Sequence, residues 1–284
     1  MEKVDTHLHL LYPENFKYSW TEGFPALQKA FTIEDFQELA QPCSIQKAVF
    51  MEVDVDAGHE VNEARFFIEK ALQPESPIAG AIAKLEPAQS DFQEQLETIL
   101  TDKLKGIRRV LHVAPDELST TPIFRENVAS LAKYDLSFDI CVRQDQLHLA
   151  CELVHACPNT RFIIDHCGNP DLNAHLSGDK DSRTQWKHGL ANLAGCENTI
   201  CKFSALGTFV EPSQRNAESL RSHFDELLET FGPHRLVWGS DWPVCNLGAG
   251  VIDWSSLSEE LTSQLSFDEQ TMIFTKNAHT VYSL

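Results

Sequence analysis

Eight short apolar runs recur along the chain, and longer stretches with helical periodicity separate them. This alternation is typical of an α/β fold in which parallel strands are joined by helical crossovers. The runs lie at residues 3–10, 47–53, 78–85, 106–113, 136–142, 161–167, 199–206 and 235–241. Eight strands in this arrangement predict a (β/α)8 TIM barrel.

The stretches between the runs have the pattern of amphipathic helices. The stretch at 90–102 places Phe92, Leu96, Ile99 and Leu100 on one apolar stripe. The chain has no break in composition, and its 284 residues are close to the usual size of one barrel, so we expect a single domain over residues 1–284. Helices are expected at 32–42, 90–102, 127–134, 146–158 and 219–232.

Long stretches without helical periodicity follow four of the predicted strands, and the first of them, 11–31, is rich in aromatic residues. Loops that follow barrel strands form the active face of such a fold. Trp20 is therefore a candidate contact for a compact organic substrate, although these rings can equally pack the loop onto the barrel. The other three stretches lie at 168–184, 207–217 and 242–254.

Histidines and one aspartate stand at the ends of three predicted strands. Side chains two positions apart on a strand face the same way, so His7 and His9 project together from the first strand. His166 ends the sixth strand, and its neighbour Asp165 should point to the opposite face as a structural residue. Asp241 ends the eighth strand, which adjoins the first in a closed barrel, so Asp241 should lie beside His7 and His9.

Further polar residues on inward-facing positions are candidate substrate contacts. Arg108 and His112 share one face of the fourth strand, and Arg109 points toward the helices unless the register slips by one residue. For each candidate, pairing with another residue of the protein is the alternative. The remaining candidates are Glu52 on the second strand, Asp139 on the fifth and Lys202 on the seventh.

Charge and composition exclude several classes of protein. The formal net charge of −19 would repel a nucleic-acid backbone or an anionic membrane surface. The N-terminus lacks the pattern of a signal peptide, and no run is long enough to span a bilayer, so we expect a soluble cytoplasmic protein of unassigned oligomeric state. Eight cysteines without a Cys-x-x-Cys pair are typical of reduced, buried side chains.

Three motifs in order carry a family resemblance: "DTHLH" at 5–9, "IIDHCGNP" at 163–170 and "LVWGSDWP" at 236–243. Together they resemble the amidohydrolase superfamily, in the branch of metal-dependent TIM-barrel hydrolases that contains sugar-acid lactonases and 2-pyrone-4,6-dicarboxylate lactonase. The resemblance implies a catalytic site of His7, His9, His166 and Asp241. Asp241 would be the general base toward water that attacks a lactone carbonyl, and the histidines would stabilise the oxyanion.

The resemblance also bears on metal binding. Members with two metals carry a histidine on the fifth strand, and here that strand reads "LSFDICV" without one. We therefore expect at most one divalent metal, zinc by preference, with His7, His9, Asp241 and His166 as its ligands. Some relatives in this branch work without a metal, and the sequence leaves that alternative open.

The leading interpretation is a hydrolase that opens an aldonolactone, with a small-molecule lactone as its partner. A carboxy-lyase of a related branch is the second interpretation, although that branch normally has the missing histidine of the fifth strand. The third is a barrel that binds a sugar acid without turning it over, which the complete set of three histidines and one aspartate argues against.

Overall fold

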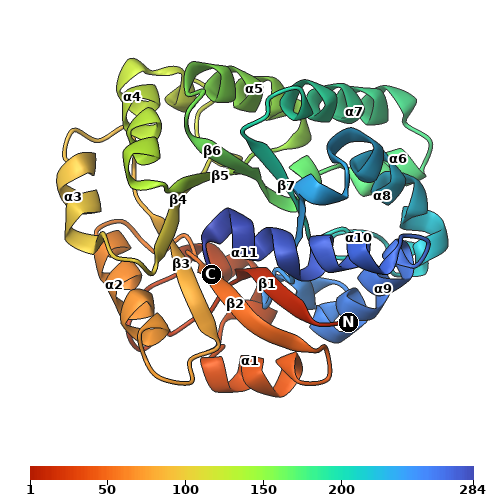
Figure 1. Cartoon of the computed structure of the whole chain (residues 1–284), viewed down its shortest axis with the longest axis horizontal. Helices are drawn as coiled ribbons and strands as arrows, with labels where there is room; N and C mark the ends of the chain where they lie inside the picture. The colour runs from red at the N-terminus through yellow and green to blue at the C-terminus, as the bar shows by residue number, and fades with distance from the viewer.

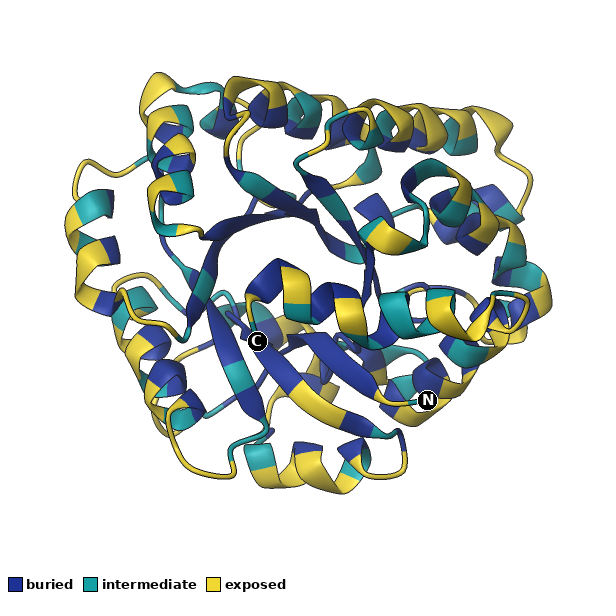
Figure 2. Ribbon diagram, viewed as in Figure 1, coloured by how far each residue is buried: buried dark blue, intermediate teal, exposed yellow.

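The computed structural model describes residues 1–284 and confirms the (β/α)8 barrel. Eight parallel strands pair in the order of the chain, and helices surround them (Figure 1). The strands are almost wholly buried, whereas the outer faces of the helices are exposed (Figure 2). The strands are β1 (Lys3–Leu8), β2 (Ile45–Met51), β3 (Ile78–Lys84), β4 (Leu104–Val110), β5 (Ser137–Cys141), β6 (Arg161–Ile164), β7 (Thr199–Phe203) and β8 (Leu236–Trp238).

Four of the predicted helices are present, and the fifth, expected at 127–134, is the end of a helix that stops at Ser130 and continues as a 3-10 helix over Leu131–Tyr134. Other helices are present that the periodicity did not single out. None of the helices is both long and apolar enough to cross a bilayer. The helices are α1 (Ile33–Ala40), α2 (Glu60–Ala71), α3 (Phe92–Ile99), α4 (Pro122–Ser130), α5 (Leu147–Ala156), α6 (Leu172–Leu176), α7 (Lys180–Ala194), α8 (Ala217–Phe231), α9 (Gly250–Thr262), α10 (Phe267–Thr271) and α11 (Asn277–Tyr282).

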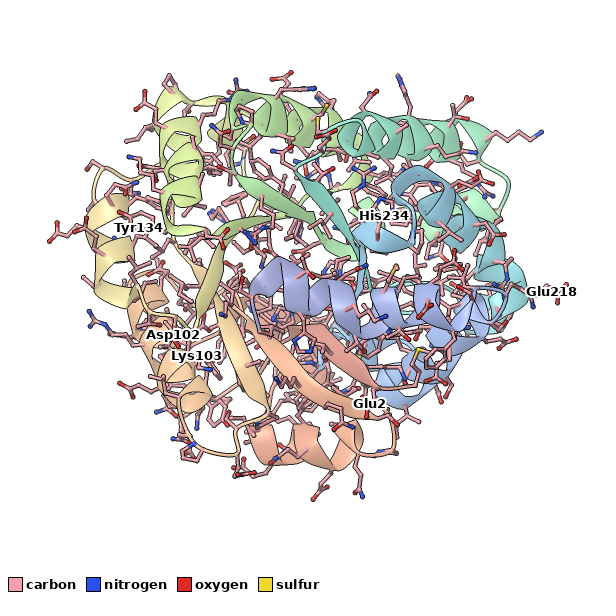
Figure 3. The ribbon with its side chains drawn as sticks, viewed as in Figure 1. Glu2, Asp102, Lys103, Tyr134, Glu218 and His234 are labelled. Carbon is pink, nitrogen blue, oxygen red and sulfur yellow. The ribbon has the colours of Figure 1, made fainter.

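The last helix closes the N-terminal end of the barrel. Val281 and Tyr282 of α11 pack against inward-facing apolar side chains of the strands in one small cluster. Figure 3 views the molecule from this end, where the labelled Lys103 and His234 belong to the connections that lead into β4 and β8. The functional end of the barrel therefore lies on the far side of that view.

Each of the eight apolar runs extends past the end of the strand it predicted, and three of those strands carry the candidate site residues. The strands β1, β6 and β8 end at Leu8, Ile164 and Trp238, so the later residues of those runs lie in turns. His166 and Asp241 adopt left-handed backbone conformations, with φ of 50° and 60°. Because such a conformation cannot continue an extended strand, the chain turns at the barrel mouth where both runs still read as apolar.

Backbone and side-chain hydrogen bonds close the barrel between β1 and the segment that follows β8. The Asp241 amide donates to the His7 carbonyl at 2.9 Å, and the His9 amide donates to the Trp242 carbonyl at 2.8 Å. The buried Asp5 carboxylate accepts hydrogen bonds from the Ser240 amide and hydroxyl. Since β8 itself has only three residues, these bonds hold the two ends of the sheet together at the mouth.

A buried histidine pair packs between the outer helices. His175 of α6 and His223 of α8 place Nδ1 and Nε2 3.2 Å apart, and the second nitrogen of each ring has no hydrogen-bond partner. Burial lowers the pKa of His223 to about 4, and the nearby Arg183 adds to the effect. Both rings are therefore neutral in the folded protein at neutral pH.

We predict that this pair makes the fold sensitive to mild acid. His223 has a lower pKa in the folded state than the ordinary value of about 6.5, so the unfolded chain binds more protons between the two values. Stability should be fully present above about pH 6.5 and should fall as the pH approaches 4, with a loss on the order of 3 kcal/mol from this residue. His223→Gln should flatten the dependence in urea unfolding measured at pH 7, 5.5 and 4.5.

The matched control is His188→Gln, which removes an exposed histidine from α7. The free energy of unfolding of this variant should equal that of the wild-type protein at each pH. If the free energy of unfolding fell with pH as steeply in His223→Gln as in the wild-type protein, His223 would not be the source of the acid sensitivity.

Candidate active site

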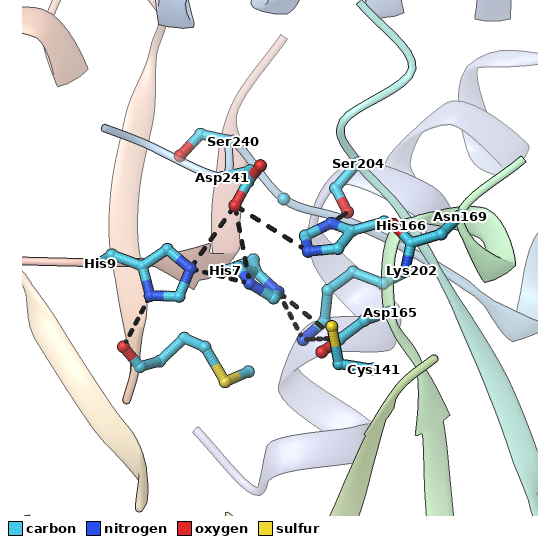
Figure 4. A network of polar contacts seen from close by, with 12 residues as sticks. His7, His9, Cys141, Asp165, His166, Asn169, Lys202, Ser204, Ser240 and Asp241 are labelled. Atoms are coloured by element: carbon cyan, nitrogen blue, oxygen red, sulfur yellow. Dashed lines mark hydrogen bonds and ion pairs between the residues drawn. The ribbon is translucent and has the colours of Figure 1, made fainter. Parts of the chain in front are cut away.

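One carboxylate oxygen faces three imidazole rings at the mouth of the barrel (Figure 4). The Oδ1 atom of Asp241 lies 3.8 Å from Nε2 of His7, 3.5 Å from Nε2 of His9 and 3.9 Å from Nε2 of His166. His7 comes from β1, and the other three residues come from the turns after β1, β6 and β8. The structure thus brings together all four residues that the sequence motifs singled out.

Neighbouring groups orient the outer nitrogen of each ring. His9 Nδ1 lies 3.0 Å from the Met51 carbonyl, and because a carbonyl only accepts, this nitrogen carries a proton. His9 Nε2 lies 3.1 Å from Nε2 of His7. His166 Nδ1 lies 2.9 Å from the Ser204 hydroxyl, which can donate or accept. The rings therefore direct their Nε2 atoms toward Asp241.

The ring of His7 has two competing neighbours. Its Nδ1 atom lies 3.1 Å from the Lys202 ammonium and 3.4 Å from the Asp165 carboxylate. Burial, reinforced by Lys202, lowers the pKa of His7 well below its ordinary value, and burial also lowers the pKa of His166. Both rings are consequently neutral at neutral pH, the state in which imidazole binds metals or accepts protons.

Below the histidines, buried charges form a compact network inside the barrel. The Lys202 ammonium lies 2.7 Å from Asp139 and 3.0 Å from Asp165, and the Arg108 guanidinium pairs with Glu52 and Asp165. Burial alone would raise the pKa of Asp165, but the positive neighbours outweigh it and hold that pKa well below its ordinary value. Burial would lower the pKa of Lys202, but Asp139 and Asp165 together raise it.

This network decides between two alternatives for three residues and corrects the prediction for a fourth. Lys202, Asp139 and Glu52 were candidates for substrate contact or for pairing within the protein, and the structure shows pairing: Lys202 binds Asp139, and Glu52 binds Arg108. All three are fully buried and do not line the cavity. The alternation of side chains correctly turned them inward, yet it carries no information on depth along the barrel. Asp165 was expected to point outward, which is wrong, because it follows the last residue of β6, where strand alternation no longer applies.

The register of β4 is as predicted. Arg108 points inward and is 4% exposed, whereas Arg109 points outward to Glu86 with an Nε to Oε2 distance of 2.6 Å. Arg108 and His112 both reach the wall of the cavity, and so does Trp20 of the loop after β1.

A cavity of about 700 Å³ lies over the four-residue cluster. Its wall comes from the loops after most of the strands, as expected for the active face of a barrel. Apolar residues make up 11 of its 19 lining residues, so the cluster sits at the base of a largely apolar chamber. Besides the predicted residues, the wall includes Asn169, Arg143, Phe209, Val113 and Leu247.

Sequence reasoning did not find the roles of Asp5 and Asn169. Asp5 holds Ser240 and thereby the turn that carries Asp241, and its position two residues before His7 is the only sequence signal for this contact. Asn169 donates from Nδ2 to the Val142 carbonyl at 2.7 Å and so ties the turn after β6 to the end of β5. The only sign of this role in the sequence is the position of Asn169 in the "CGNP" segment, which is typical of a turn.

Comparison with known proteins supports the resemblance seen in the motifs. The family model described as Amidohydrolase matches residues 4–284. An L-fucono-1,5-lactonase from Burkholderia multivorans is 27% identical, with 99% of this chain and 96% of the relative covered. An L-rhamnono-gamma-lactonase from Scheffersomyces stipitis is 25% identical over 76% of this chain and 69% of the relative. A zinc-bound amidohydrolase structure from B. multivorans has a TM-score of 0.88 at 26% identity and full coverage of both chains.

We predict that Lys202 is essential to the stability of the site. Lys202→Met removes the cation that neutralises Asp139 and Asp165, so both carboxylates lose a buried partner. The unfolding free energy in urea should fall by about 3–5 kcal/mol. The double variant Lys202→Met, Asp139→Asn should recover part of this loss, because Asp139, which has no other cationic partner, is then neutral, while Asp165 keeps Arg108.

Lys187→Met is the matched control, since Lys187 pairs with Glu226 at 2.9 Å on the exposed surface of α7. Its effect should stay within about 1 kcal/mol. If the Lys202 variant were as stable as this control, or if the double variant recovered nothing, the buried network would not have the assigned role.

Proposed function

The chain belongs to the amidohydrolase family, and we propose that it hydrolyses the lactone of a sugar acid, an aldonolactone, to the open-chain acid. The observation that carries the proposal is the single Asp241 carboxylate, surrounded by three imidazole Nε2 atoms at the base of a cavity. Relatives named as L-fucono- and L-rhamnono-lactonases that align along most of this chain favour this reaction over other hydrolyses.

In the proposed reaction, Asp241 is the general base. Its carboxylate takes a proton from water as the water oxygen bonds to the lactone carbonyl carbon, and the carbonyl oxygen becomes an oxyanion. His7, His9 and His166 surround Asp241 (Figure 4). His7 and His166 would face this charge with an Nε2–H when Lys202 and the Ser204 hydroxyl donate to their Nδ1 atoms. When the ring C–O bond breaks, Asp241 returns the proton to the leaving alkoxide, so one water is consumed and one hydroxy acid is formed.

The same residues fit one divalent metal. Donor atoms of His7, His166 and Asp241 all lie within 4.8 Å of one another, and His9 Nε2 is 3.1 Å from His7 Nε2. Ligand atoms held about 2.0–2.1 Å from a tetrahedral zinc are separated by about 3.4 Å, which is close to these spacings. A bound divalent metal would polarise the lactone carbonyl as a Lewis acid. The nitrogen and oxygen donors, and the zinc in the similar B. multivorans structure, favour zinc.

The carboxy-lyase alternative has less support. That branch normally has a histidine on the fifth strand. Here the inward-facing positions near the end of β5 hold Asp139 and Cys141 instead, and Asp139 is already paired with Lys202. A barrel that only binds a sugar acid would not need the arrangement of three imidazole rings around one carboxylate.

We predict that Asp241→Asn abolishes lactone hydrolysis. An amide cannot take the proton from water, so kcat should fall by about 10²–10⁴-fold. Turnover is measured as proton release from a panel of aldonolactones, after subtraction of spontaneous hydrolysis, and circular dichroism checks the fold. The control is Asp253→Asn, an exposed position on α9. Undiminished turnover in Asp241→Asn would rule out the general-base role.

We also predict about one zinc per chain in purified protein, with turnover that falls on chelation and returns when zinc is added. His9→Gln should lower the zinc content measured by mass spectrometry, because it removes a ligand. His112→Gln should leave the zinc content unchanged, since His112 lies on the wall beside Cys141 rather than next to Asp241. Full activity in metal-free protein would instead assign the chemistry to the residues alone.

A further inference from the structure

The wall above the catalytic cluster is apolar to a degree that hydroxyl recognition does not require. Side chains from the ends of several strands and from the turn after β8 form it: Val53, Val110, Val142, Val244 and Leu247. Trp20 adds an aromatic ring from the loop after β1, with its indole nitrogen already donating to the Val53 carbonyl at 2.7 Å. The cavity therefore presents hydrocarbon, not hydrogen-bonding groups, over much of its surface.

Three exposed apolar side chains continue this wall to solvent. Val113 is 68% exposed, Phe209 is 61% exposed and Phe24 is 39% exposed, and each lines the same cavity. They come from the connections after β4, β7 and β1. We call Phe24, Val113 and Phe209 the apolar collar. Exposed apolar side chains from three separate segments around one opening indicate a surface that a ligand covers.

Most polar side chains in the wall already have partners within the protein. Asp54 pairs with Lys84 at 2.8 Å, and Arg143 binds Asp145 and the His112 carbonyl. The Asn169 amide donates to a backbone carbonyl, and Arg108 is bound by Glu52. A ring with several hydroxyls would lose water on entering this cavity and find few free groups to replace it, which is unfavourable for each unpaired hydroxyl.

The volume leads to the same conclusion. An aldonolactone occupies about 200 Å³ at the packing density of organic solids, whereas the cavity holds about 700 Å³. A lactone placed with its carbonyl at Asp241 would leave much of the apolar wall and the collar uncovered.

We propose that the substrate is a lactone that carries an apolar alkyl or aryl substituent, which packs along the valine-rich wall and under the apolar collar. This inference rests on the proposed lactone hydrolysis, but it sets an apolar lactone against the aldonolactone as the preferred substrate, so the two predict opposite rankings. The lactone carbonyl and ring oxygen bind at the polar base, and the substituent extends toward the mouth. Phe209 and Val113 then determine specificity by covering apolar surface and do not take part in the bond-breaking steps.

The test is a series of γ-butyrolactones with γ-alkyl chains from methyl to hexyl, compared with D-glucono-1,5-lactone. Because burial of one methylene is worth about 0.8 kcal/mol, kcat/KM should rise about fourfold per added carbon until the chain reaches solvent. Phe209→Ser and Val113→Thr should each reduce the increase in kcat/KM per added carbon. Both positions are exposed, so these substitutions leave the core intact.

Phe267→Ser is the control, because Phe267 is 74% exposed on α10 and does not line the cavity. It should keep the full increase with chain length. If the gluconolactone is the better substrate and chain length has no effect, the inference is overturned while lactone hydrolysis stands.

If neither class of lactone is turned over, the proposed function fails, and the collar is then tested by binding alone. The corresponding γ-alkyl-γ-lactams, which resist hydrolysis, should bind more tightly with each added carbon in calorimetry, and Phe209→Ser should remove that gain. Equal affinities along the lactam series would overturn the inference independently of any catalysis.

Discussion

Closure of the barrel between β1 and the segment after β8 is the constraint on which the site depends. A three-residue β8 cannot close the sheet by ladder bonds alone, so the Asp241 amide bonds to the His7 carbonyl and Asp5 binds Ser240. These bonds join the residue that presents the carboxylate to the strand that presents the first imidazole. Closing the fold therefore also sets the geometry of the four-residue cluster, and a chain that did not close here would have neither.

The charged side chains beneath the histidines are buried inside the barrel and therefore need partners within the protein. A residue at this depth of a barrel is removed from water, and an unpaired charge there is strongly unfavourable. Two cations meet this requirement by pairing with three carboxylates: Lys202 pairs with Asp139 and Asp165, and Arg108 pairs with Glu52. Beneath them, the apolar cluster that includes Tyr282 fills the barrel. The network helps to keep His7 and His166 neutral and holds His7 in place, which their proposed chemistry requires.

The fold was predictable because eight apolar runs alternate with stretches of helical periodicity, and the motifs located the four residues of the cluster. Two kinds of information were missing. Periodicity does not report where a strand stops, so Asp165 was assigned to the wrong face and His166 to a strand rather than a turn. Alternation reports the face of a strand but not depth along the barrel axis, so Lys202 was placed in contact with substrate although it lies beneath His7.

The apolar wall bears on the chemistry as well as on substrate choice. A carboxylate that must take a proton from water works best where few other waters compete for it, and hydrocarbon around the cavity lowers the number that do. The same surroundings strengthen the interaction between a developing oxyanion and the groups at the base, because the local dielectric response is weak. A substituent that covers the collar would complete this exclusion of water. Binding of the apolar group and acceleration of the reaction would thus both depend on the apolar wall of the cavity.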